Sequence, residues 1–224
     1  MSIMPNVARS PRGLSGTVYE ELRERICLLR YPPGHVLREP ELAAEFGVSR
    51  TPIRQVLQKL EFEGFVEVRN GVGTIVTGVD FMQVKDVYEL RLKLAELIGQ
   101  MNPRPITEAD ISIVKGLIER ADKLPAARDP EEFWRINHER QRIVGSVTTN
   151  AALHAIFDLC YYQTARVWFR LADVMWEEQV EALRIELSDI LRALQSGDPQ
   201  AVGYVERNHL RFYMVLIGRY ISGH

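Results

Sequence analysis

Only one stretch of this 224-residue chain alternates apolar and polar residues with the period of a β-strand. Residues 65–69 and 74–77 form two short runs of this kind, and they flank Asn70-Gly71. Asn-Gly between such runs is typical of a tight hairpin, because both residues tolerate positive φ angles. Elsewhere the apolar residues recur at helical spacing. The sequence therefore predicts a mainly α fold with one small β-hairpin.

Three helices are predicted before the hairpin. The apolar spacing indicates helices over about 15–30, with Ser15 as N-cap, over 40–46 and over 50–63. Gly47 suits the left-handed residue that ends the second helix and turns the chain into the third. This order of elements is that of a winged helix-turn-helix: a helix, a short helix, a tight turn, a third helix and a hairpin.

The residues after Gly78 show no strand signal and predict a bundle of six or seven helices. Thr107 stands three residues before Asp110, as in a capping box, and Asn150 precedes another apolar run. We expect four segments: a flexible N-terminal arm over 1–12, the winged helix-turn-helix over 13–78, a linker over 79–84 and an all-helical domain over 85–222.

The third helix combines an apolar stripe with a polar, non-acidic face. The chain's net charge of −2 does not by itself indicate a nucleic-acid partner, so DNA binding must come from local clustering. No acidic residue occurs between Ser49 and Leu60. Arginine reads guanine, glutamine reads adenine, and small hydroxyl groups bind phosphate. The face predicted to enter the major groove consists of Arg50, Thr51, Arg54, Gln55 and Gln58. The alternative is a solvated polar surface.

The hairpin tip offers a second candidate contact. Arg69, Asn70 and Gly71 place one cation and several backbone amides at the turn. These groups suit a phosphate or the minor groove.

The first part resembles the DNA-binding domain of GntR-family transcription regulators over about residues 14–77. The residues that carry the resemblance are Gly34, Leu37, Glu41-Leu42-Ala43, Gly47-Val48-Ser49-Arg50-Thr51-Pro52-Ile53-Arg54, Leu60-Glu61 and Glu63-Gly64. It implies a dimer on a palindromic operator. The DNA contacts that it implies are Ser49, Arg50, Thr51, Pro52 and Arg54, with Asn70 and Gly71 on the wing. Pro40 departs from the pattern, because some members carry a DNA-contacting Arg there.

The second part resembles the FCD-type ligand domain of the FadR branch of that family. The resemblance rests on Val87-Tyr88-Glu89-Leu90-Arg91, Asn150-x-x-Leu153, Gly197-Asp198 and His209-Leu210. Such domains usually bind a divalent metal through one Asp and three His. The aligned positions here are Asn137, Gln141, Leu187 and His209. Amide oxygens are weak ligands for transition metals and leucine is none, so we expect no metal. A shifted register through His138 is the open alternative, although His138 falls about 140° from Phe133 round the helix.

Polar residues on inward-facing helix stripes predict an effector pocket that works without metal. The candidates are Arg91, Asn137, Arg140, Gln141 and His209. An arginine among them would hold the carboxylate of a small organic acid bidentately. In the alternative, these residues pair with one another or with a neighbouring carboxylate in the core. Four aromatic residues are expected to serve packing instead: Tyr161, Tyr162, Trp168 and Phe169.

These features predict a ligand-responsive DNA-binding regulator in the cytoplasm. The resemblance implies that it acts as a homodimer and favours a repressor. Because no window of about 18 residues is continuously apolar, we expect no membrane span. Cys27 and Cys160 are expected to be reduced thiols. One alternative is an enzyme acting on a small acid, but no nucleophile with its base or paired carboxylates stands out. The other is a winged helix used for protein contacts, which predicts no salt-sensitive DNA binding.

Overall fold

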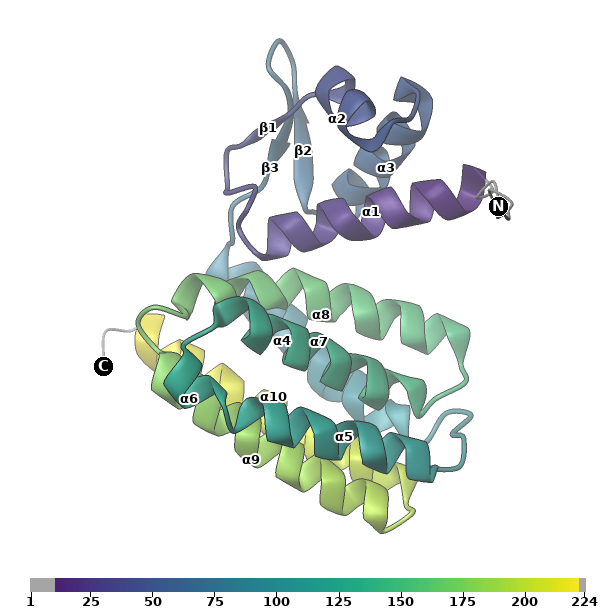
Figure 1. Cartoon of the computed structure of the whole chain (residues 1–224), viewed down its shortest axis with the longest axis vertical. Helices are drawn as coiled ribbons and strands as arrows, with labels where there is room; N and C mark the ends of the chain where they lie inside the picture. The colour runs from purple at the N-terminus through teal and green to yellow at the C-terminus, as the bar shows by residue number, and fades with distance from the viewer. Residues whose placement is uncertain (1–10, 222–224) are drawn as a thin grey trace, which may run out of the picture. The chain divides into compact units, whose positions relative to one another are not determined.

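The structure, a computed structural model, describes residues 11–221 and divides into two compact units between Gly78 and Val79 (Figure 1). The predicted arm over 1–12 lies outside the described residues except for its last two, which belong to a helix. Among the described residues, the first unit holds three helices and three strands, and the second holds seven helices.

The first unit is built on α1 (Pro11–Cys27), α2 (Glu39–Phe46) and α3 (Arg50–Phe62). The apolar stripe predicted on the third helix is buried: Ile53, Val56, Leu57 and Leu60. Gly47 adopts φ 64° and ends α2, as its position in the sequence predicted. The short turn after it delivers the chain into α3, which forms the second helix of a helix-turn-helix.

A small antiparallel sheet completes this unit. Its strands are β1 (Val36–Leu37), β2 (Val66–Arg69) and β3 (Gly73–Val76), in the order β1-β3-β2. The predicted hairpin is confirmed as β2 and β3, which pair from Val66 opposite Val76 to Arg69 opposite Gly73. The sequence analysis did not predict β1, because two residues are too few to show an alternating pattern.

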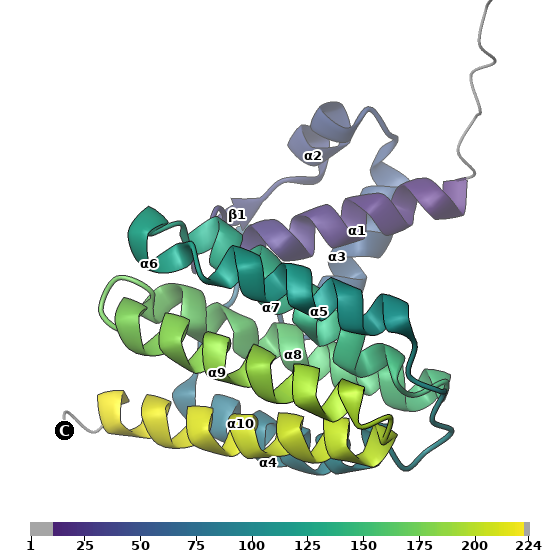
Figure 2. The same cartoon turned by 60° about the horizontal axis from the view of Figure 1, so that its bottom comes forward.

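The second unit is a bundle of helices. Its members are α4 (Phe81–Ile98), α5 (Glu108–Ala121), α6 (Leu124–Ala127), α7 (Pro130–Ser146), α8 (Ala151–Leu171), α9 (Trp176–Gln195) and α10 (Pro199–Ile221). Figure 2 shows α4 and α10 side by side, and these two helices pack against each other along their length. Within residues 11–221, no helix is both long enough and apolar enough to cross a membrane. The predicted mainly α fold, with a winged helix-turn-helix and a helical bundle, is confirmed.

Hydrogen bonds between capping side chains and nearby backbone amides start helices of the bundle. Thr107 and Asp110 form the capping box at the start of α5. The Asn150 side chain accepts from the Leu153 amide at 3.1 Å and caps α8. The Asp129 side chain accepts from the amides of Glu131 and Glu132 and caps α7. Each cap satisfies backbone donors that a helix leaves unpaired in its first turn.

Three predicted boundaries differ from the structure. The first helix begins at Pro11, so Ser15 lies inside it and is not its N-cap. It ends at Cys27, because Leu29 turns to φ 56°. The helix α4 begins at Phe81, within the expected linker, because Asp80 accepts from the Met82 amide at 2.8 Å and caps it early.

The close approach of α4 and α10 supports a stability prediction. A Cβ added at Gly203 would stand 2.5 Å from the Ala95 carbonyl oxygen, so Gly203→Ala must push the two helices apart. We expect a loss of about 1–3 kcal/mol in unfolding free energy. Gly218→Ala is the control, because its added Cβ meets nothing within 4 Å in the same helix. It is expected to gain about 0.5–1 kcal/mol.

Urea unfolding followed by tryptophan fluorescence measures this effect in the right unit. The chain has three tryptophans, and Trp134, Trp168 and Trp176 all lie after Val79. Equal stability of the Gly203→Ala protein and the unmodified protein would contradict the close packing of α4 and α10.

Candidate DNA-binding face and effector cavity

The residues predicted to meet DNA lie on the outer side of α3. The exposed ones are Ser49, Arg50, Thr51, Arg54, Gln55 and Gln58, and Pro52 is half-buried. Ser49 occupies the N-cap position, but its hydroxyl makes no capping hydrogen bond. Because the opposite stripe of α3 is buried in the core of the unit, the helix offers its polar groups on one face. Such a face suits reading the major groove.

The hairpin presents the other predicted contacts. Arg69, Asn70 and Gly71 are all exposed at the turn between β2 and β3. The Val72 amide donates to the Arg69 carbonyl at 3.0 Å and closes this turn. The tip is therefore a compact projection with one cation on it.

Two of the predicted cations have a carboxylate beside them. Both Nε and Nη2 of Arg54 donate to Glu39 at 3.0 Å, and this pairing lowers the pKa of the Glu39 carboxyl. Arg69 Nη2 lies 2.6 Å from Glu67. Both arginines are largely exposed and solvent reaches both carboxylates, so the pairs are screened and DNA competes with them at little cost.

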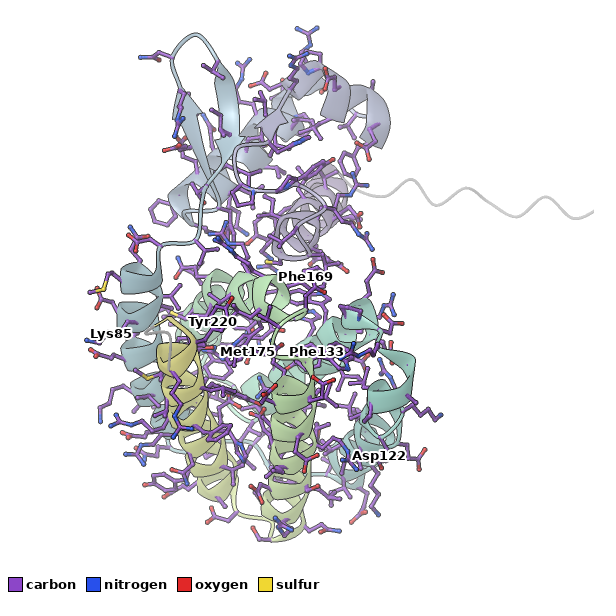
Figure 3. The ribbon with its side chains drawn as sticks, turned by 90° about the vertical axis from the view of Figure 1, so that its left-hand side faces the viewer. Lys85, Asp122, Phe133, Phe169, Met175 and Tyr220 are labelled. Atoms are coloured by element: carbon purple, nitrogen blue, oxygen red, sulfur yellow. The ribbon has the colours of Figure 1, made fainter. Side chains whose placement is uncertain are left out.

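A cavity lies among α4, α7, α8, α9 and α10 of the second unit. The empty space between its walls, counted together with its open mouth, is about 570 Å³. Seven aromatic side chains line it: Tyr88, Phe133, Trp134, Tyr161, Trp168, Phe169 and Tyr213. The polar lining consists of Arg91, Asn137, Arg140, Thr164 and Gln179. Figure 3 labels Phe133 and Phe169, which enter the lining from α7 and α8.

A buried ion cluster lies beside this cavity. Arg140 Nη1 donates to Glu186 Oε1 at 2.7 Å and also donates to Glu206. Arg91 Nη2 lies 3.6 Å from Glu206 Oε1, and Arg91 Nη1 donates to Thr164 Oγ1 at 2.7 Å. All five residues are buried, so the two cations and two carboxylates must balance one another inside the protein.

Burial and neighbouring charges perturb the protonation of this cluster. Burial raises the pKa of Glu186 above its ordinary 4.5, and Glu206 raises it further, while Arg140 opposes both. Burial disfavours the charge on Arg140, but Glu186 and Glu206 outweigh burial and raise the pKa of Arg140. The Tyr213 hydroxyl donates to Glu186 at 2.7 Å and satisfies its second oxygen.

The structure brings three of the five predicted effector residues to the cavity, namely Arg91, Asn137 and Arg140. Gln141 is fully buried but does not line it. His209 does not line it either, because its Nε2 pairs with Asp189 Oδ2 at 2.8 Å. The alternative to an effector role was that these groups pair with neighbouring carboxylates in the core. Arg140 does so with Glu186, and His209 does so with Asp189.

Two parts of the lining were missed by the sequence analysis. Tyr161, Trp168 and Phe169 were expected to serve packing only, yet their rings form part of the cavity wall. Gln179 was not considered, although it is buried and lines the cavity. The signal was present, because Gln179 stands three residues after Trp176 and four before Leu183, and both of these are buried apolar residues of α9.

The positions that hold a metal in related domains do not suit one here. Asn137 Nδ2 donates to the Phe133 carbonyl at 2.9 Å, and Leu187 has no donor atom. His209 is bonded to Asp189, while the side chain of Gln141 makes no hydrogen bond among the described residues. His138, the alternative ligand, lies beside the Tyr162 hydroxyl with ring nitrogens at 3.0 and 3.2 Å. Across residues 11–221, no three His, Cys, Asp or Glu side chains gather as a metal site.

Two family models match the chain. Residues 14–76 match "Bacterial regulatory proteins, gntR family", and residues 86–212 match "FCD domain". The second match alone covers more than half of the chain. The two matches fall on separate compact units.

Similar proteins agree with these matches. An uncharacterized HTH-type transcriptional regulator, YdhC of Bacillus subtilis, is 25% identical over 141 residues, which cover 62% of this chain and 63% of the relative. The chain thus spans less than two thirds of that relative's length. A probable D-xylose utilization operon transcriptional repressor of Paenarthrobacter nicotinovorans is 24% identical, with 92% of each chain covered. The structure of E. coli McbR/YncC shares the fold, with a TM-score of 0.75 and 19% identity over 93% of this chain and 98% of that one.

The buried cluster generates a prediction about stability and pH. Arg140→Met leaves Glu186 and Glu206 buried without their shared cation, so we expect a loss of about 3–5 kcal/mol near neutral pH. A carboxyl whose pKa is higher in the folded chain stabilises the fold below its unfolded pKa and loses this contribution as pH rises. The deficit of the variant is therefore expected to shrink as the pH falls from about 7.5 to about 5.

Arg135→Met is the matched control, because Arg135 lies on the same helix with its ion pairs half-exposed. Its loss is expected to stay below about 1 kcal/mol. Urea unfolding at the two pH values gives both quantities. A deficit for Arg140→Met that is small or independent of pH would contradict the role given to the cluster.

Proposed function

The chain belongs to the GntR family of bacterial transcription regulators, in the branch with an FCD domain, and from this premise we propose that it is a metabolite-responsive repressor. In this proposal the winged helix-turn-helix up to Gly78 binds DNA. The helical unit from Val79 binds the effector and forms the dimer.

The DNA-binding half of the proposal rests on α3. The stripe from Ile53 to Leu60 on one side of this helix is buried. The exposed residues on the other side are Arg50, Arg54, Gln55 and Gln58. A homodimer offers two such helices to two half-sites one helical turn of DNA apart, which requires a palindromic operator. The single observation that carries this half is the exposed, non-acidic face of α3.

The effector half rests on the cavity among five helices. Its aromatic lining and its few convergent polar groups are those of a small-molecule site. A ligand that binds one arrangement of these helices more tightly than another shifts the balance between DNA-binding and released dimers. The Paenarthrobacter relative is a probable repressor, which supports repression as the effect of DNA binding on transcription.

An organic acid is the effector that the sequence favoured, held by Arg140 or Arg91. Both guanidinium groups already face Glu206, so a carboxylate ligand must compete with that side chain. The proposed site of action is the cytoplasm, where DNA is found.

Replacing the two arginines of α3 tests the DNA-binding half. We expect Arg50→Ala with Arg54→Ala to weaken operator binding by roughly 30-fold or more, because each loses a base or phosphate contact. The salt dependence of binding is expected to become shallower as well. Fluorescence anisotropy measures both effects, with a labelled duplex selected from random DNA by the unmodified protein.

Arg192→Ala is the control for the change in charge, because Arg192 is an exposed residue of α9 in the other unit. Mass photometry on the same duplex is expected to show two protein chains per operator. If the double variant keeps both its affinity and its salt slope, the α3 face does not read DNA.

A further inference from the structure

Resting on the proposed function, we propose that the cavity takes a flat, uncharged ring compound with a carboxamide-type edge, and that Gln179 reads this edge. Three observations support the ligand class: the aromatic lining, the internal neutrality of the ion cluster and the unpaired amide of Gln179.

The lining favours a flat ring. Trp134 and Tyr161 lie with ring centroids 6.0 Å apart in a stacked arrangement, and Trp168 and Tyr213 meet edge to face at 5.0 Å. All four rings line the cavity. Planar rings gain from offset stacking and edge contacts with such walls, whereas a saturated ring of the same size gains only burial.

The ion cluster disfavours a charged ligand. Arg91 and Arg140 carry two positive charges, Glu186 and Glu206 carry two negative ones, and all four side chains are almost completely buried. The sum is zero, so an anion or a cation in the cavity would bring an unbalanced charge into a poorly solvated site. A neutral ligand avoids that cost.

Gln179 supplies the group that selects a polar edge. It is 1% exposed and lines the cavity, and neither its Nε2 nor its Oε1 has a hydrogen-bond partner among the described residues. A buried amide without partners is costly, and a ligand that satisfies it recovers that cost. A primary or cyclic amide presents a donor next to an acceptor and pairs with both atoms at once. This pairing works for either assignment of the glutamine oxygen and nitrogen.

Four probes separate these requirements. Benzamide is flat and neutral and has an amide edge. Benzoate has a charged carboxylate in place of the amide, and toluene has no polar edge. Cyclohexanecarboxamide has the amide edge but its ring is not flat. Isothermal titration of the full-length protein near neutral pH is expected to show benzamide binding about tenfold or more tighter than the other three. A tenfold ratio matches the cost of leaving a buried amide unpaired.

Two variants assign the edge to Gln179. Gln179→Leu keeps the size of the side chain but removes both polar atoms, so benzamide binding is expected to fall about tenfold while folding is kept. Gln195→Leu is the matched control, because Gln195 is an exposed residue on the same helix. It is expected to leave benzamide affinity unchanged.

Each other result overturns the inference. If benzoate binds as tightly as benzamide, the site takes acids. If toluene binds as tightly, the site does not require an amide edge. If cyclohexanecarboxamide binds as tightly, the site does not require a flat ring. Absence of benzamide binding, or full binding by Gln179→Leu, would overturn it as well. Operator binding is measured without ligand, so none of these results counts against the DNA-binding half of the proposed function.

Discussion

The helical unit depends on one buried arrangement of charge. Arg140 of α7 joins Glu186 of α9 and Glu206 of α10, while Arg91 of α4 reaches Glu206 and Thr164 of α8. Five helices therefore share one set of hydrogen-bonded ions. Because an unpaired buried charge is strongly destabilising, the cluster tolerates only those helix positions that keep every member paired.

The same cluster links the cavity to the rest of the chain. Arg91 and Arg140 line the cavity and belong to the cluster, so a ligand that alters their contacts acts on five helices together. One of these helices, α4, follows the hairpin after only residues 77–80. In the proposed function, this short connection would carry a change in α4 to the winged helix. The coupling energy of such a switch would come from the proposed ligand's preference for one helix arrangement.

In the first unit, the sequence was sufficient to predict the elements that position the candidate DNA-binding face. The buried stripe of α3, the left-handed Gly47 and the hairpin around Asn70-Gly71 all follow from spacing and from residue type. What the sequence analysis did not foresee is the pairing of Arg54 with Glu39, 15 residues earlier, on α2. That contact depends on how two helices lie against each other, which no pattern within a single helix records.

The second unit shows where local information ends. Sequence alone placed the caps at Thr107 and Asn150, because these hydrogen bonds span only three residues. It also placed Arg140 on an inward face, but its partners lie 46 and 66 residues further along the chain. Whether a buried polar group is paired or left open, as Gln179 is, depends on which helices meet around it. Periodicity decides which side of a helix is buried. Only the packing of helices that are distant in the sequence decides which partners a buried side chain meets.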